Sequence, residues 1–221
     1  MKTMTAAVLG ATGLIGENLV QQLLNDPAFS KVRIVVRRQV KLSHPKLEVQ
    51  AVNFDNLAEY RSKLGKGDCI FCCIGTTQKK VNGDKNKYRS IDLNIPVNAA
   101  EMGKDAGFIK YLLVSSVGAN AHAANFYLQL KGEIENEIAA INFDSFHVFR
   151  PGFLLGKRKE FRLVEIIAKG VMPIISGLFF GKSEKYKAIE ASDVAKAMVA
   201  AAKSDGKGMF VHHYPDMMKI K

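Results

Sequence analysis

A tyrosine and a lysine four residues apart, Tyr127 and Lys131, are the side chains of this sequence best suited to acid–base chemistry. On a helix this spacing places the phenol and the ammonium one turn apart on the same face. The ordinary pKa of a phenol is near 10, and a neighbouring ammonium favours the ionised form. Ser115 and Ser116 end an apolar run shortly before the pair, and a serine hydroxyl there could hydrogen-bond the carbonyl oxygen of a substrate. Together these side chains predict hydride transfer in which the tyrosine supplies the proton.

The first part of the chain predicts a binding site for a dinucleotide. An apolar run leads into the loop GATGLIG, residues 10–16, and a helical pattern follows over 17–25. Gly10 permits a tight turn, Gly13 lets the backbone approach a pyrophosphate, and Gly16 lets the helix pack closely on the sheet. The helix N-terminus offers N–H groups and the positive end of its dipole to phosphates. Because the loop follows a strand and opens a helix, it is stronger evidence than glycines alone.

Two arginines, Arg37 and Arg38, follow the expected second strand, at the place where an acidic residue would select NAD(H). A guanidinium pairs with phosphate through forked, charge-assisted hydrogen bonds, so we expect NADP(H) rather than NAD(H). The alternative is that both arginines are solvated loop charges. We expect Asp55 to face the adenine and Gly75 to touch the middle of the cofactor. The residues expected to contact the cofactor are Gly10, Thr12, Gly13, Leu14, Ile15, Gly16, Arg37, Arg38, Asp55, Ile74, Gly75 and Thr76.

Alternating strand-like and helix-like segments predict an α/β fold with a doubly wound parallel sheet, the Rossmann fold. No linker or repeat divides the chain, so we expect one domain over residues 1–221, with residues 153–190 forming a small substrate-side extension or lid. Its apolar stretch over 164–181 is either a lid over the substrate or a helix and loop packed on the body. The expected strands end at Leu9 and cover 32–36, 49–52, 69–74, 111–114, 146–149 and 209–211; the expected helices cover 17–25, 56–64, 88–106 and 126–141, and a last helix is capped by Ser192–Asp193 and runs to Ala202.

Composition and charge exclude several classes of protein. The 221 residues carry a formal net charge of +11, but the basic residues are scattered and form no aromatic-rich strip, which argues against nucleic-acid binding. Charged residues and a proline interrupt the 164–181 stretch, so we expect no membrane span. Cys69, Cys72 and Cys73 lack the spacing of disulfides or metal sites, so we expect no metal and a reducing compartment. The N-terminus does not resemble a signal peptide, and we therefore expect a cytoplasmic protein.

Five stretches of the sequence resemble a known superfamily. They are GATGLIG, FSKVRIVVRR, FCCIGTT, NFYLQLKGEIE and FDSFHVFRPGFLL, and they lie between about Ala7 and Leu155. In them the chain resembles the short-chain dehydrogenase/reductase superfamily, in its atypical, epimerase/dehydratase-like branch, and within it the Tat-interacting-protein-like oxidoreductases. The resemblance implies a Rossmann core, NADP(H) binding, and catalytic roles for serine, tyrosine and lysine.

Carried over to this chain, the resemblance makes Tyr127 the acid/base. Lys131 then tunes Tyr127 and holds the nicotinamide ribose, and Pro151 lies near the nicotinamide. Ser116 orients the substrate, with Ser115 as the alternative. The superfamily often has an asparagine in the helix before the fifth strand; this chain has Asp92 there, a departure that bears on turnover more than on cofactor binding.

Two functions remain open at this point. The first is an NADP(H)-dependent oxidoreductase acting on a small carbonyl or alcohol, or on a nucleotide-sugar-like substrate. The second is a regulatory module that binds NADP(H) and changes its protein partners with redox state. A pure sensor would not need the serine, tyrosine and lysine, so their presence favours the enzyme. We expect a monomer or homodimer that binds a small-molecule substrate and no nucleic acid.

Overall fold

The computed structural model describes residues 3–156 and 184–220, and its centre is a parallel sheet of seven strands. The strand order is β3-β2-β1-β4-β5-β6-β9, and every neighbouring pair is parallel. The strands are β1 Met4–Leu9, β2 Phe29–Val36, β3 Leu47–Ala51, β4 Cys69–Cys72, β5 Lys110–Val114, β6 Ser145–Phe149 and β9 Gly208–His212. The chain runs outward in both directions from β1 and β4, so a crevice is expected between them at the carboxyl ends of the strands.

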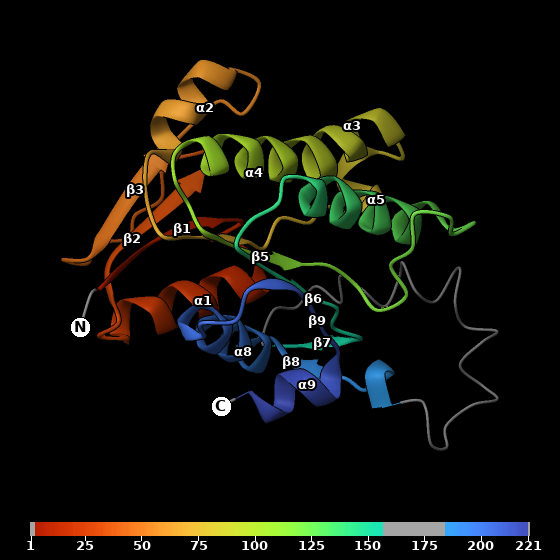
Figure 1. Cartoon of the computed structure of the whole chain (residues 1–221). Helices are drawn as coiled ribbons and strands as arrows, with labels where there is room; N and C mark the ends of the chain where they lie inside the picture. The colour runs from red at the N-terminus through yellow and green to blue at the C-terminus, as the bar shows by residue number, and fades with distance from the viewer. Residues whose placement is uncertain (1–2, 157–183, 221) are drawn as a thin grey trace.

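Helices cover both faces of the sheet (Figure 1). On one face lie α1 Leu14–Asn25, α8 Ala191–Lys203 and α9 Tyr214–Lys219; on the other lie α2 Leu57–Leu64, α3 Lys85–Arg89, α4 Ile95–Asp105 and α5 Phe126–Ala140. Each face has its own apolar core, because successive residues of a strand point to opposite sides. In β1, for example, Val8 packs toward α1 while Leu9 belongs to the core on the opposite face. The predicted doubly wound α/β fold is thereby confirmed.

The helix expected over 88–106 is interrupted. It consists of α3, a π-helical turn over Ser90–Asn94, and α4, which begins at Ile95 with a proline in its first turn. Pro96 has no backbone N–H to donate to the carbonyl four residues earlier, that of Asp92, and its ring would clash with that carbonyl in a regular helix. The wider turn accommodates the proline, and such π-turns are frequent at functional sites.

The helix near the C-terminus also begins earlier than expected. α8 starts at Ala191 with Glu190 at its N-cap and no side-chain capping bond, so the expected cap by Ser192–Asp193 is wrong. The first turn instead follows a two-stranded parallel ladder, in which β8 Ile189–Glu190 pairs with β7 Leu154–Leu155. The ladder and the core fix where the chain enters the helix, because Ile189 and Ala191 are both buried.

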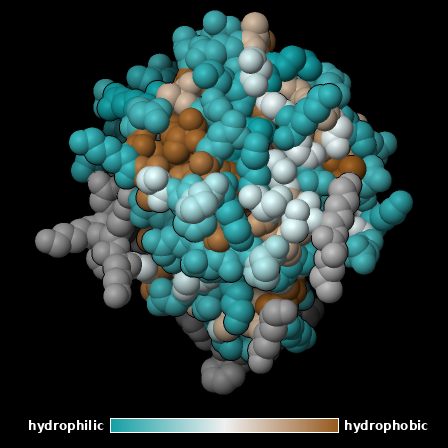
Figure 2. All heavy atoms as spheres, turned by 90° about the vertical axis from the view of Figure 1, so that its left-hand side faces the viewer, coloured by the Kyte–Doolittle hydropathy of each residue, from teal (hydrophilic) through white to brown (hydrophobic). Residues whose placement is uncertain are grey.

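Only the two ends of the expected extension over 153–190 can be described. The N–H of Ile189 donates to the carbonyl of Phe153 at 2.8 Å, which ties the two ends together. The apolar stretch over 164–181, expected to be either a lid over the substrate or a helix and loop packed on the body, lies outside the described residues. Among the helices that the structure describes, none is both long and apolar enough to cross a bilayer. The face on the side of the N-terminus is predominantly hydrophilic, with small apolar areas (Figure 2).

Candidate functional site

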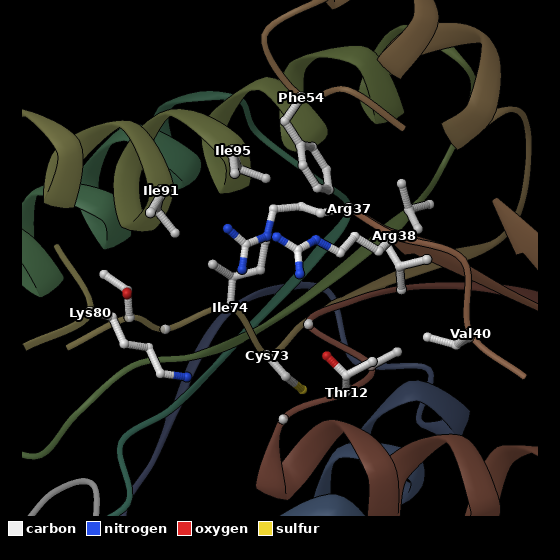
Figure 3. Close-up of a pocket in the computed structure, with 17 residues that line it drawn as sticks. Thr12, Arg37, Arg38, Val40, Phe54, Cys73, Ile74, Lys80, Ile91 and Ile95 are labelled. Atoms are coloured by element: carbon white, nitrogen blue, oxygen red, sulfur yellow. The ribbon is translucent and has the colours of Figure 1, made fainter. Parts of the chain in front are cut away.

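A cleft of about 340 Å³ opens at the carboxyl ends of β1, β2 and β4. The glycine loop forms its floor, the segment after β2 forms one wall, and the segment after β4 with the π-helical turn forms the other (Figure 3). This is the crevice that the strand order predicts. The lining residues are Gly10, Ala11, Thr12, Gly13, Val35, Val36, Arg37, Arg38, Val40, Phe54, Cys73, Ile74, Gly75, Thr76, Lys80, Ile91 and Ile95.

The glycine loop has the close backbone contacts that a dinucleotide site needs. Gly10 has a φ of +76°, and a Cβ there would lie 2.5 Å from the backbone carbonyl of Cys73. No side chain caps α1, whose N-cap is Gly13, so the first-turn N–H groups are left for a ligand. These features fit a pyrophosphate held by backbone N–H groups at a helix N-terminus.

Leu14, Ile15 and Gly16 were expected to contact the cofactor through the same loop, but none of them lines the cleft. The first turn of α1 directs the side chains of Leu14 and Ile15 into the core beneath the sheet. A Cβ on Gly16 would lie 2.1 Å from the carbonyl oxygen of Gly10, so this glycine is needed for packing against the loop itself.

Arg37 and Arg38 are exposed and both line the cleft. Their guanidinium groups lie next to each other and point into it (Figure 3). In the part of the chain that the structure describes, neither arginine has a hydrogen bond or an ion pair with an acidic side chain, and no carboxylate lines this cleft. Two such cations are suited to a doubly charged phosphate.

The backbone after β4 is fixed from two sides. The N–H of Thr76 donates to the Asp92 carboxylate at 2.7 Å, and the Tyr88 hydroxyl donates to the Thr76 carbonyl at 3.0 Å. Asp92 is fully buried and Tyr88 is buried. Ile74, Gly75 and Thr76 all line the cleft, and these two bonds fix the backbone there at Thr76.

Asp55 does not line the cleft; the neighbouring Phe54 does. The N–H of Asp55 donates to the Asn53 side chain at 3.1 Å, and this turn directs Phe54 inward. Asp55 lies instead in an adjacent hollow of about 580 Å³ that shares Arg37 with the cleft. An adenine in the cleft would thus meet an aromatic ring at this position.

Tyr127 and Lys131 lie together on α5, whose first turn is fixed by its N-cap. The Asn125 side chain accepts the N–H of Tyr127 at 3.0 Å, and the Lys131 ammonium lies 5.8 Å from the centre of the Tyr127 ring. The Ser116 hydroxyl donates to the carbonyl of Val117 at 3.3 Å and is near enough to the phenol to lower the pKa of Tyr127. The structure therefore brings together three of the four side chains from which the sequence predicts acid–base chemistry.

A carboxylate, that of Asp92, also lies beside these side chains and forms a buried ion pair with Lys131 at 3.2 Å. Burial raises the pKa of Tyr127; the Lys131 ammonium and the neighbouring Ser116 hydroxyl oppose the rise, and the Asp92 carboxylate adds to it. Burial alone would lower the pKa of Lys131, but Asp92 reverses the sign, and the pKa lies above the ordinary value. The expected influence of the ammonium on the phenol is present, and burial outweighs it.

Ser115 belongs to a different network. Its hydroxyl donates to Glu135, which also accepts from Arg150 at 3.0 Å and forms an ion pair with it. Ser115 and Glu135 are both buried. This network joins the end of β5 to α5 and to the end of β6, so Ser115 is held by a structural partner while Ser116 faces Tyr127.

Pro151 and Lys131 do not line the cleft that the arginines enter. Pro151 is buried, and its carbonyl accepts the N–H of Val117 at 3.0 Å. It therefore fixes the segment after Ser116 to the end of β6. This places Pro151 on the Ser116–Tyr127 side of the site, away from Arg37.

Several residues that line the cleft were not among those expected, namely Ala11, Val35, Val36, Val40, Phe54, Cys73, Lys80, Ile91 and Ile95. Ile91 and Ile95 reach it because the π-helical turn shifts the helical face. Cys73 follows the end of β4 and is half-buried, whereas Cys69 and Cys72 are fully buried. An apolar run alone does not reveal where a strand stops, so no signal in the sequence separates these cysteines.

The family model described as "NAD(P)H-binding" matches residues 10–205. Protein HTATIP2 of Rattus norvegicus is 34% identical over 172 residues, which are 76% of this chain and 70% of that protein. Among solved structures, a UDP-N-acetylglucosamine 4-epimerase from Methanobrevibacter ruminantium M1 in complex with UDP-N-acetylmuramic acid has a TM-score of 0.70 at 18% identity, covering 96% of this chain and 77% of that one. The last similarity concerns the fold alone.

One comparison corrects an expectation. Protein FMP52-1, mitochondrial, of Scheffersomyces stipitis is 34% identical over 177 residues, which are 79% of this chain and 78% of that protein. Relatives from Aspergillus niger and Candida albicans, each 30% identical, are likewise mitochondrial by name. The expectation of a cytoplasmic protein is therefore wrong, and these relatives point to mitochondria.

Proposed function

The chain belongs to the NAD(P)H-binding family, and its sequence resembles the atypical short-chain dehydrogenase/reductases; we propose that it is an NADP(H)-dependent oxidoreductase. Its substrate would be a small carbonyl or alcohol, or a nucleotide-sugar-like compound. The observation that carries the proposal is the pair of guanidinium groups, Arg37 and Arg38, in a cleft whose described lining has no carboxylate. An acid at this position would instead favour a free ribose hydroxyl.

The chemistry of reduction divides between the cofactor and the chain. When bound, the reduced nicotinamide supplies the hydride that forms the new C–H bond at the carbonyl carbon. The Ser116 hydroxyl hydrogen-bonds the carbonyl oxygen and orients it. The Tyr127 phenol gives that oxygen its proton, and the Lys131 ammonium stabilises the phenolate left behind. Because burial raises the pKa of Tyr127, the phenol is fully protonated at neutral pH, which is the form that reduction requires.

The test of cofactor choice is a fluorescence titration with NADPH and NADH. Arg37→Ala with Arg38→Ala should weaken NADPH binding by roughly a hundredfold or more, since charge-assisted hydrogen bonds contribute about 1.5–3 kcal/mol each, and should leave NADH binding nearly unchanged. Lys63→Ala with Lys66→Ala removes the same number of positive charges away from the cleft and serves as the control. Unchanged NADPH affinity in the arginine variant would exclude the arginines as the 2′-phosphate site.

The test of turnover uses the NADPH complex with a panel of carbonyl compounds. Oxidation of NADPH by some member of the panel supports the reductase. Tight binding of NADPH combined with no oxidation by any aldehyde, ketone or nucleotide sugar would favour the alternative function, a module that binds NADP(H) and acts through protein partners.

A further inference from the structure

The carboxylate of Asp92 joins two parts of the site that the sheet topology leaves separate. One oxygen accepts the N–H of Thr76, in the segment after β4 that lines the cleft, at 2.7 Å. The other lies 3.2 Å from the ammonium of Lys131 on α5. Asp92 is 0% exposed, and both of its oxygens have a partner. No covalent connection shorter than the whole of α4 and β5 links these two segments.

We propose that Asp92 is a positioning residue, which holds the Lys131 ammonium in a fixed place relative to the Gly75–Thr76 backbone and so aligns the Tyr127–Lys131 pair with the cofactor. The inference rests on the proposed function and adds a residue to it. An ammonium has three N–H donors. One is used by Asp92, so two remain for the phenolate of Tyr127 and for a ribose hydroxyl.

The local backbone shows why this position is held firmly. Asp92 lies in the π-helical turn that Pro96 imposes, and the hydroxyl of Tyr88, in the preceding helix α3, donates to the carbonyl of Thr76 at 3.0 Å. The acid is thus fixed by its own helix and by its partner loop.

The charge of Asp92 acts on Tyr127 as well as on Lys131. Four groups from four segments face the phenol, namely Lys131 of α5, Ser116 after β5, Asp92 of the π-helical turn and Tyr88 of α3. Lys131 and Ser116 favour the phenolate, whereas Asp92 disfavours it. Asp92 thus adds to the effect of burial on the phenol while it holds the cation that stabilises the ionised form.

The decisive variant is Asp92→Asn, which keeps an oxygen for the Thr76 N–H and removes the charge. While Lys131 remains an ammonium, the Tyr127 phenolate should then appear at lower pH, by about one pH unit, the size typical of a nearby charge. The pH dependence of Lys131 acetylation in the same variant reports whether the lysine keeps its charge. It is measured as the tyrosinate difference absorbance between each protein and its Tyr127→Phe counterpart. If turnover is found, the high-pH fall of kcat should move in the same direction while NADPH affinity changes less than kcat.

Glu48→Gln is the matched control, because Glu48 pairs with Arg33 at 3.0 Å at the β2–β3 ladder, far along the sheet from α5. A phenolate midpoint in Asp92→Asn equal to that of wild type and Glu48→Gln would overturn the proposal. Absence of NADPH binding or turnover in wild type would overturn the proposed function instead, and the phenol titration would still decide the role of Asp92.

A second measurement needs no substitution and covers the case in which Asp92→Asn does not fold. The pH dependence of Lys131 acetylation in the wild-type protein is followed by peptide mass spectrometry. Burial alone lowers a lysine pKa, whereas a carboxylate partner raises it, so the sign separates the two. An acetylation midpoint above the ordinary lysine range supports the positioning role of Asp92, and a midpoint within or below that range overturns it.

Discussion

Tyr127 is the residue on which the proposed proton transfer depends. Tyr127→Phe keeps the ring and its packing and removes the proton, so we expect turnover to fall by about a hundredfold or more. NADPH affinity should stay nearly unchanged, because Tyr127 does not line the cleft that the arginines enter. Initial rates and a fluorescence titration measure the two quantities. Tyr186→Phe, at an exposed tyrosine, is the control, and turnover retained by Tyr127→Phe would exclude the phenol as the proton donor.

The sequence predicts some of the contacts among these side chains and not others. The spacing of Tyr127 and Lys131 was sufficient to predict that they lie together, because residues four apart are neighbours on the surface of an α-helix. Choosing between Ser115 and Ser116 was not, since adjacent residues differ only in direction, and the direction is set by the distant Glu135 and Arg150. Asp92 stood out as a departure from the superfamily pattern, but its ion pair with Lys131 depends on a contact 39 residues apart.

At the scale of elements, the distance between the serine and the tyrosine is set by how closely α5 packs on the loop that precedes it. A Cβ on Gly132 of α5 would lie 2.1 Å from the Ala121 nitrogen and 2.3 Å from the Asn120 carbonyl carbon. Gly132→Ala should therefore push the loop away and destabilise the protein by about 1–3 kcal/mol, the usual cost of overpacking. Turnover should fall further than stability requires, because Ser116 moves relative to Tyr127.

Urea unfolding at neutral pH measures the effect of Gly132→Ala, with Ser62→Ala on an exposed face of α2 as the control. An unchanged unfolding midpoint would show that the loop can shift without cost. The same glycine illustrates a limit of sequence reasoning: a glycine in a helical pattern predicts a weaker helix, while the reason for it lies in a contact with another segment.

Element boundaries were harder to predict than the elements themselves. Strands β1, β2, β4, β5 and β6 lie close to where apolar runs predict them, because a strand buried on both faces has a continuous apolar sequence. The prediction of one continuous helix over 88–106 was wrong in detail, because one proline changes the hydrogen-bond spacing of the preceding turn. That change also brings Ile91 and Ile95 to the cofactor cleft.

Across the whole molecule, a pair of histidines on the last two strands of the sheet, His147 buried and His212 half-buried, couples the stability of the sheet to pH. His147 of β6 lies 2.9 Å from the Ser145 hydroxyl and 2.9 Å from His212 of β9, and its ring stacks on that of His212. Burial lowers the pKa of His147 to about 4, and the charges of His212 and Lys110 add to the effect. Burial likewise lowers the pKa of His212.

The sign of the pH dependence follows from which state takes up protons. Below the unfolded pKa of about 6.5 the unfolded chain protonates this histidine, while the folded protein does not until about pH 4. The free energy of unfolding should therefore fall as pH decreases through this window, by roughly 3 kcal/mol for a shift of this size. Urea unfolding at pH 7 and pH 4.5 measures the loss. His147→Gln, which keeps hydrogen-bonding groups but cannot titrate, should lose much less stability over the same interval, whereas His122→Asn, at an exposed loop, should behave as wild type. Equal losses in wild type and His147→Gln would assign the pH dependence to other groups, because the loss would then occur without a titrating imidazole at position 147.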